Sequence, residues 1–204
     1  MTLQNRVTPF NELVADASYR GKFMGNRGLL HDGHKRLIRQ FNGKRWIICV
    51  TDYKGVRRAP MTPGLYTELF FFDEAVALAA GHRPCALCRR AEYRSFREAI
   101  VAQGGALLSA VDLDAQLDAE RRNGDVQRRH RVPGTDVPDG AMIAIGDAAY
   151  LVLRSEMFEF STKGYRAAGS VPTGDVEMLT PPLTAMALHG GFRPAIDQSA
   201  SVRR

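Results

Sequence analysis

Residues 66–90 read YTELFFFDEAVALAAGHRPCALCRR, and this stretch decides the expected fold of the first half of the chain. The apolar run Leu69–Phe72 has the composition of a buried strand. Asp73–Ala80 has the pattern of a short helix, and Gly81 is typical of a helix end. The stretch therefore predicts a strand, a short helix and a sharp exit into the segment that follows.

That following segment carries a Cys-x-x-Cys motif formed by Cys85 and Cys88. At this spacing both thiolates can face one metal ion, and such a pair is half of a tetrahedral zinc site. Plain free thiols are one alternative. A redox role is another, but the thioredoxin-type motif opens a helix in a βαβ unit, and that pattern is not found here. The motif favours zinc.

The missing zinc ligands must come from Cys49, a histidine or a carboxylate elsewhere in the chain. The third cysteine, Cys49, is a candidate, although a cysteine in an apolar strand is often a buried small hydrophobic residue. His31 and His34 are the best histidine candidates because they lie in a glycine-bearing loop before that strand. Each histidine could instead be a surface or capping residue. His82 is close in sequence, but a residue immediately before the motif usually points away.

Length and composition limit the class of protein. The chain has 204 residues, 45% of them hydrophobic, which allows one sizeable domain or two small ones. Its apolar runs are shorter than the roughly 20 residues that a membrane span needs, and the N-terminus lacks the apolar core of a signal peptide. Three cysteines, an odd number, argue against a disulfide framework. We expect a cytoplasmic protein without a membrane partner.

The formal charge of +6 is concentrated in the first 60 residues, where twelve Lys and Arg stand against four Asp and Glu. This asymmetry predicts an anionic partner, although a solvated basic face is an equally good interpretation. Residues 1–45 look irregular, and their glycines and basic residues suit a loop that approaches phosphates. The fixed pattern of a P-loop is missing from this segment.

Further elements follow from composition and periodicity. Arg45–Tyr53 reads as a buried strand, and we expect it to form an antiparallel hairpin with Tyr66–Phe72. Arg89–Gln103 has a helical apolar stripe, and Leu113–Arg122 reads as a second helix with Asp112 as its N-cap.

The second half of the chain reads mainly as short strands closed by a helix. The expected strands are Met142–Ile145, Ala149–Leu153, Met157–Phe160 and Val176–Leu179, and the expected helix is Pro181–Leu188.

The predicted fold class is α+β. An antiparallel hairpin or small sheet with helices and the Cys-x-x-Cys knuckle, the turn that carries Cys85 and Cys88, is followed by a small β-unit. The proline-bearing loop after the basic run at 128–131 suggests a division into a basic N-terminal region, 1–131, and a β-rich C-terminal unit, 132–204. The two parts could also pack as one domain.

The motif around the knuckle resembles the zinc-binding N-terminal domain of the Ada alkylation-repair family. The resemblance covers residues 45–90 and implies a strand hairpin, a zinc ion and contact with DNA. In that family a cysteine pair at the hairpin turn supplies the other two ligands, whereas the matching turn here, KGVRRAPM, has none, so methyl transfer is not predicted. The matching residues are Phe70–Phe72, Glu74, Ala75, Ala79, Ala80, Gly81, Arg83, Pro84, Cys85 and Cys88.

Basic residues around the knuckle suggest a phosphate-binding face for DNA or another nucleic acid. No base-reading set can be named, so the expected binding is nonspecific and salt-sensitive. An ordinary helix surface with ion pairs is the alternative. The candidate residues are Arg57, Arg58, Arg83, Arg89, Arg90 and Arg94.

Two other function classes stay open. One is an enzyme of unknown reaction whose site lies between the two halves, near His130, Asp136 and Asp139. The other is a metal-free interaction or scaffold protein. A zinc-dependent nucleobase deaminase fits poorly because no His-x-Glu or Cys-x-Glu supplies its general acid–base glutamate.

Overall fold

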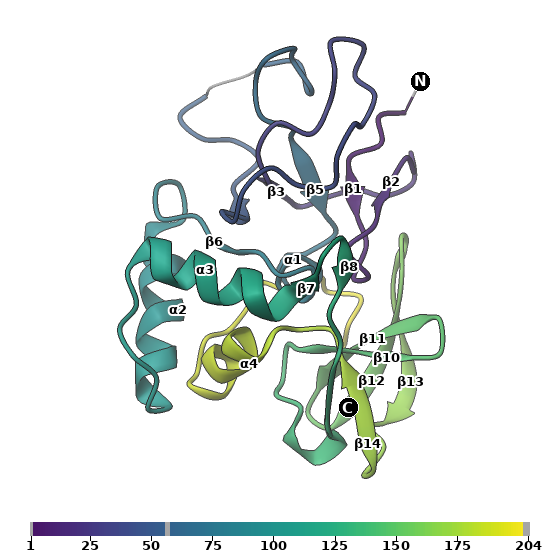
Figure 1. The fold of residues 1–204 in the computed structure, drawn as a ribbon. Coiled ribbons are helices and arrows are strands. Elements are labelled where there is room, and N and C mark those ends of the chain that lie inside the picture. Colours follow the sequence, from purple (N-terminus) through teal and green to yellow (C-terminus); the bar gives the residue numbers. More distant parts are fainter. Residues whose placement is uncertain (1, 56–57, 202–204) are drawn as a thin grey trace.

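The computed structural model describes residues 2–55 and 58–201, which form two six-stranded sheets with helices between and beside them (Figure 1). This arrangement confirms the α+β class. The first sheet is mixed and has the order β2-β1-β5-β3-β4-β6. Its strands are β1 (Arg6–Val7), β2 (Leu13–Val14), β3 (Phe23–Asn26), β4 (Ile47–Cys49), β5 (Leu69–Phe71) and β6 (Arg83–Pro84).

The expected antiparallel hairpin of Arg45–Tyr53 with Tyr66–Phe72 was wrong, because the strands β4 and β5 of these segments lie in one sheet but do not pair with each other. The strand β3 lies between them and is antiparallel to both. A side chain at Gly25 would place its Cβ only 2.1 Å from the carbonyl oxygen of Ile47, so glycine permits this close pairing. The expectation that 1–45 is irregular was therefore wrong for β1, β2 and β3. Its strands are short, and the sequence of β3, FMGN, contains no β-branched residue.

The short helix α1 (Glu74–Ala79) lies at the centre of the molecule, and all its residues are buried (Figure 1). Asp73 is its N-cap, because the Asp73 carboxylate accepts a 3.0 Å hydrogen bond from the backbone N–H of Val76. The helix exit turns at Gly81, whose φ of +80° is a conformation that favours glycine. Both ends agree with the sequence prediction.

The longer helices also form near their predicted positions. The helix α2 (Arg90–Ala102) buries one apolar face, and α4 (Pro182–His189) begins with proline in its first turn. The helix α3 (Ala110–Arg121) starts earlier than expected, because Ser109 and not Asp112 is its N-cap. The Ser109 hydroxyl accepts a hydrogen bond from the N–H of Asp112. No helix in the described part of the chain is long and apolar enough to cross a membrane.

The second sheet is antiparallel throughout and has the order β13-β12-β11-β10-β14-β9. The four predicted strands are present, and β9 and β13 were missed. The division suggested between 1–131 and 132–204 falls inside β9 and stays a prediction. The strands are β9 (His130–Pro133), β10 (Met142–Ile145), β11 (Ala148–Leu153), β12 (Glu156–Ser161), β13 (Gly164–Ser170) and β14 (Asp175–Met178); a small hairpin, β7 (Arg122–Asn123) with β8 (Val126–Gln127), and the 3₁₀ turn Gly134–Asp136 precede β10.

Hydrogen bonds to the first turn of α1 join the two sheets. One oxygen of Asp73 accepts from the Tyr165 hydroxyl at 2.9 Å and from the Asp197 N–H at 3.0 Å. Glu74 accepts from the N–H of Ala195 at 2.9 Å. The segment after α4 therefore returns to the centre of the molecule and fixes α1 against both halves.

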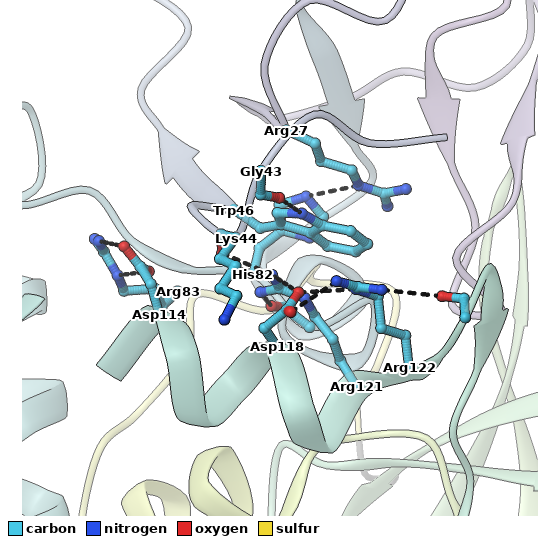
Figure 2. A network of polar contacts seen from close by, with 12 residues as sticks. Arg27, Gly43, Lys44, Trp46, His82, Arg83, Asp114, Asp118, Arg121 and Arg122 are labelled. Atoms are coloured by element: carbon cyan, nitrogen blue, oxygen red, sulfur yellow. Dashed lines mark hydrogen bonds and ion pairs between the residues drawn. The ribbon is translucent and has the colours of Figure 1, made fainter. Parts of the chain in front are cut away.

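A buried stack around Trp46 holds the start of β4 against α3. Figure 2 shows the Trp46 indole between the guanidinium groups of Arg27 and Arg121, whose central carbons lie 4.1 and 3.9 Å from the ring centroid. Arg121 donates to the carbonyls of Gly81 and Lys44 at 3.1 and 2.6 Å. This one side chain therefore ties α3 to the exit of α1 and to the segment that leads into β4.

Candidate metal centre

Three cysteines from two distant segments meet at one edge of the first sheet. The sulfur atoms of Cys49, Cys85 and Cys88 all lie within 4.8 Å of one another. Cys49 and Cys85 are buried, with 7% and 8% of their surface exposed, and Cys88 is half-buried. Of the two interpretations of Cys49, ligand or plain core residue, the geometry supports the ligand.

Strand pairing brings the two segments together. The strand β6, just before the motif, runs parallel to β4, with Pro84 opposite Ile48. The N–H of Cys85 then donates to the carbonyl of Ile48 at 2.9 Å, which continues the ladder by one residue. Because Cys49 is the next residue of β4, the two side chains leave the backbone side by side.

Two buried ion pairs fix the backbone on either side of the motif. Arg83 donates two 2.8 Å hydrogen bonds to Asp114 of α3, and this fork is visible in Figure 2. Arg89 pairs in the same bidentate way with Glu74 of α1. All four groups are largely removed from solvent, where bidentate pairs are strong and directional. The knuckle is thus anchored to two helices.

The sulfurs share hydrogen bonds that lower the energy of one thiolate. The pKa of Cys85 is lowered to about 5, first because the Cys49 thiol donates to it and also because the N–H of Leu87 donates at 3.4 Å. The pKa of Cys49 is raised, because it is the donor of that bond and because it is buried. Burial raises the pKa of Cys88. A cation can replace the shared protons, since thiolates are the metal-binding form.

The predicted histidine ligands lie outside this group. His31 is buried, with Nδ1 2.6 Å from the Thr67 hydroxyl and Nε2 3.2 Å from the carbonyl of Thr62. His34 is exposed, and its backbone N–H donates to Asp32. In the described ranges, no His, Asp or Glu joins the three sulfurs. The structure therefore brings Cys49 to the knuckle and leaves both histidines apart from it.

The predicted phosphate-binding arginines divide into two classes. Arg83 and Arg89 form the buried ion pairs and point into the protein. Arg58 is half-buried, pairs with Glu68 and stacks on Tyr66, so its guanidinium is also engaged by protein groups. Arg90 and Arg94, at the start of α2, are exposed. Arg57 lies outside the described residues.

The residues considered for an enzyme between the two halves do not converge. His130 bonds through Nε2 to the carbonyl of Glu120 at 2.9 Å. Asp139 accepts a 2.6 Å hydrogen bond from the N–H of Arg154, and Asp136 is exposed on the turn before it. In the described part of the chain these residues form no metal-binding group. Nothing in their contacts assigns a reaction to them.

A cavity of about 560 Å³ beside the cysteines was not predicted from the sequence. Burial raises the pKa of Tyr66 in its wall, and the sulfurs of Cys49 and Cys88 raise it further, which places this phenol within electrostatic reach of the centre. No local sequence pattern predicts this cavity, because it depends on the pairing of β3 with β4. Its lining residues are Met24, Val50, Thr51, Asp52, Tyr53, Arg58, Pro60, Tyr66, Glu68 and Phe70.

Comparison with protein-family models, with curated proteins and with solved structures gives no match. The chemistry of the centre is therefore argued from its own residues. Three clustered sulfurs, two of them on a Cys-x-x-Cys knuckle, form a possible metal site.

Proposed function

We propose that the protein binds one Zn²⁺ through the thiolates of Cys49, Cys85 and Cys88. The observation that supports this most directly is the meeting of all three cysteines of the chain within 4.8 Å. In tetrahedral coordination, a Zn–S bond of about 2.3 Å separates two sulfurs by about 3.8 Å. The group can therefore close on the ion with small side-chain movements.

Zinc fits the donor set better than the harder divalent cations. Thiolates select soft or borderline ions, whereas Mg²⁺ and Ca²⁺ take oxygen ligands. The knuckle also offers backbone N–H groups to sulfur, as in the bond from Leu87 to Cys85. Such bonds offset part of the negative charge of three thiolates. The resemblance to the zinc domain of the Ada family supports the same ion.

The bound ion would hold the first sheet to the start of α2. Cys49 and Cys85 are 36 positions apart, so the metal would close a long loop of chain. Binding free energy of this kind adds to folding stability when the unfolded chain holds the ion weakly. The site would therefore stabilise the fold in addition to any ligand that it binds.

The test is the zinc content of tag-free protein purified under reducing conditions. We expect about one zinc per chain for the native protein and less than about a tenth of that for Cys49→Ser, Cys85→Ser or Cys88→Ser. The variants His31→Gln and His34→Ala are matched controls, since both side chains lie outside the group, and they are expected to keep the metal. A native protein without zinc would overturn the proposal.

Nucleic-acid binding is the second candidate function. It is supported by the charge excess of the first 60 residues and by the exposure of Arg90 and Arg94 beside the knuckle. We propose nonspecific contact with phosphates through these two side chains. Each phosphate contact contributes about 0.9 to the slope of log affinity against log salt concentration.

A salt titration with double-stranded DNA tests this second function. The double variant Arg90→Ala/Arg94→Ala is expected to lower that slope by about 2, whereas the matched variant Arg166→Ala, an exposed arginine of β13, leaves it unchanged. Absence of binding at low salt, or an equal loss in the matched variant, would contradict the proposal.

A further inference from the structure

The cysteine centre supplies only three ligand atoms. Among the described residues, no fourth His, Cys, Asp or Glu atom joins the sulfurs of Cys49, Cys85 and Cys88. A structural zinc site usually has four protein ligands, whereas three leave one position of the tetrahedron for an outside molecule. A centre with three protein ligands can therefore bind an outside molecule at its fourth position as well as stabilise the fold.

The cavity beside the centre has walls that touch the ligand-bearing elements. Val50 lines it and directly follows Cys49 in the chain. Met24 lines it from β3, in the position paired with Cys49. Tyr66 lines it within electrostatic reach of the sulfurs of Cys49 and Cys88. At about 560 Å³ the cavity has the size of a small-molecule site.

The three thiolate donors limit the chemical class of molecule that can bind at the fourth position. Three thiolates give the zinc centre a net charge of −1 and supply much electron density to the ion, so a bound water would gain little acidity. Soft donors such as sulfur bind well at a thiolate-rich centre. The cavity wall adds aromatic and apolar surface from Met24, Tyr53, Tyr66 and Phe70. A sulfur atom on an apolar body matches both features.

We propose that the fourth position of the zinc centre faces this cavity and binds a small thiol with an apolar body. The thiol binds as its thiolate, and its S–H proton leaves to solvent. This inference rests on the proposed zinc site and names the ligand class of that same site.

Tyr66 is placed to orient the bound thiol. The guanidinium of Arg58 lies 3.9 Å from the centroid of the Tyr66 ring and donates to the backbone carbonyl of Tyr66 at 2.9 Å. Arg58 is in turn paired with the buried Glu68, whose other oxygen accepts from the N–H of Met61 at 2.8 Å. Arg58 thus contacts both the ring and the backbone of Tyr66, and we expect the phenol to donate to the metal-bound sulfur.

The test uses the zinc-loaded full chain and X-ray absorption at the zinc edge. Benzyl mercaptan is the probe, and benzyl alcohol, which lacks the sulfur, is its matched control. We expect the sulfur number to rise from three to four with the thiol and to stay at three with the alcohol. In cobalt-loaded protein the thiolate-to-metal absorption should rise saturably by about one third, as three thiolates become four.

A cavity-filling variant locates the thiol. Thr51→Trp places a large side chain in the cavity wall and keeps all three cysteines, and it should weaken thiol binding at least tenfold. Thr173→Trp, on an exposed loop, is its control and should bind as the native protein does. A sulfur number that stays at three, loss of the metal to the thiol, or equal effects of the two variants would overturn the inference. A chain that takes up no zinc at all would instead overturn the proposed function.

Discussion

The backbone N–H of Cys85 donates to the carbonyl of Ile48 over 2.9 Å, and this bond sets the Cys85 side chain beside that of Cys49. The metal centre is therefore a consequence of sheet pairing between β4 and β6. Whatever fixes those two strands also fixes the sulfurs. Three features hold these strands in place: the turn at the end of α1, the stack on Trp46 and the ion pairs beside the knuckle. Each of them can be tested separately.

The exit of α1 depends on glycine at position 81 for two reasons. Its φ is +80°, and an added Cβ would lie 2.5 Å from Cδ of Arg121. Gly104 has nearly the same φ, +81°, but open space around it. Gly81→Ala should therefore lower the free energy of unfolding by about 2–4 kcal/mol, and Gly104→Ala by about 1 kcal/mol. Urea unfolding measures both, and equal losses would contradict the steric argument.

The two arginines on Trp46 should respond to substitution in opposite ways. Arg27 is fully buried, and neither of its terminal nitrogens has a hydrogen-bond partner among the described residues. Burial, followed by repulsion from Arg121, lowers the pKa of Arg27. Arg27→Met should leave the free energy of unfolding unchanged or raise it by about 1–2 kcal/mol, because removing a buried charge that has no anionic partner outweighs the loss of the hydrogen bond from Arg27 Nε to His82.

Arg121→Met provides the contrast at the other face of the same ring. Arg121 donates to two carbonyls and to Asp118, so its loss leaves buried acceptors without donors. The expected loss is about 2–4 kcal/mol, measured by urea unfolding beside Arg27→Met. An equal loss in the Arg27 variant would contradict this account and would show that the hydrogen bond to His82 outweighs the cost of the buried charge.

Local patterns in the sequence predicted much of this fold. The apolar stripe of α2, the extent and stop of α1 and four strands of the second sheet follow from periodicity and from turn residues within a few positions. The strand β3 was missed because a four-residue segment with a glycine has no such pattern. Its position between β4 and β5 is set by tertiary packing, which no local signal reports.

At the candidate site, too, features set by nearby residues could be predicted, whereas contacts between distant segments could not. The pair Cys85 and Cys88 was readable from its spacing, and Cys49 could be only one of several possible partners. Arg83 and Arg89 looked like surface residues because their partners, Asp114 and Glu74, are 31 and 15 positions away. The cavity could not be predicted at all, since it forms only when β3 lies beside β4.

Breaking the buried pair of Arg83 and Asp114 should destabilise the fold strongly, whereas replacing both residues with apolar ones should destabilise it much less. Asp114→Ala leaves a buried guanidinium unpaired and should lower the free energy of unfolding by about 3–5 kcal/mol. The double variant Arg83→Met/Asp114→Leu should recover most of that loss. Asp175→Ala breaks an exposed pair with Arg131 and should change stability by at most about 1 kcal/mol. A double variant as unstable as Asp114→Ala would contradict this account.

The carboxyl of Asp73 should make stability fall as pH rises. Burial raises the pKa of Asp73 to about 6, above its ordinary value of 3.8. Between these two pH values the folded protein holds a proton that the unfolded chain has lost, so its contribution to stability decreases with rising pH. The decrease is roughly 3 kcal/mol between about pH 4 and pH 6, and the contribution is constant above that range.

The measurement compares the native protein with Asp73→Asn, which cannot titrate at this position. The free energy of unfolding of the native protein, minus that of the variant, should fall by roughly 3 kcal/mol from pH 4 to pH 7. Taking this difference removes the contribution of other carboxyls, such as Asp118, whose pKa is lowered and whose effect on stability has the opposite sign. A difference that stays flat, or that rises with pH, would show that hydrogen bonds from Tyr165 and Asp197 outweigh burial at Asp73.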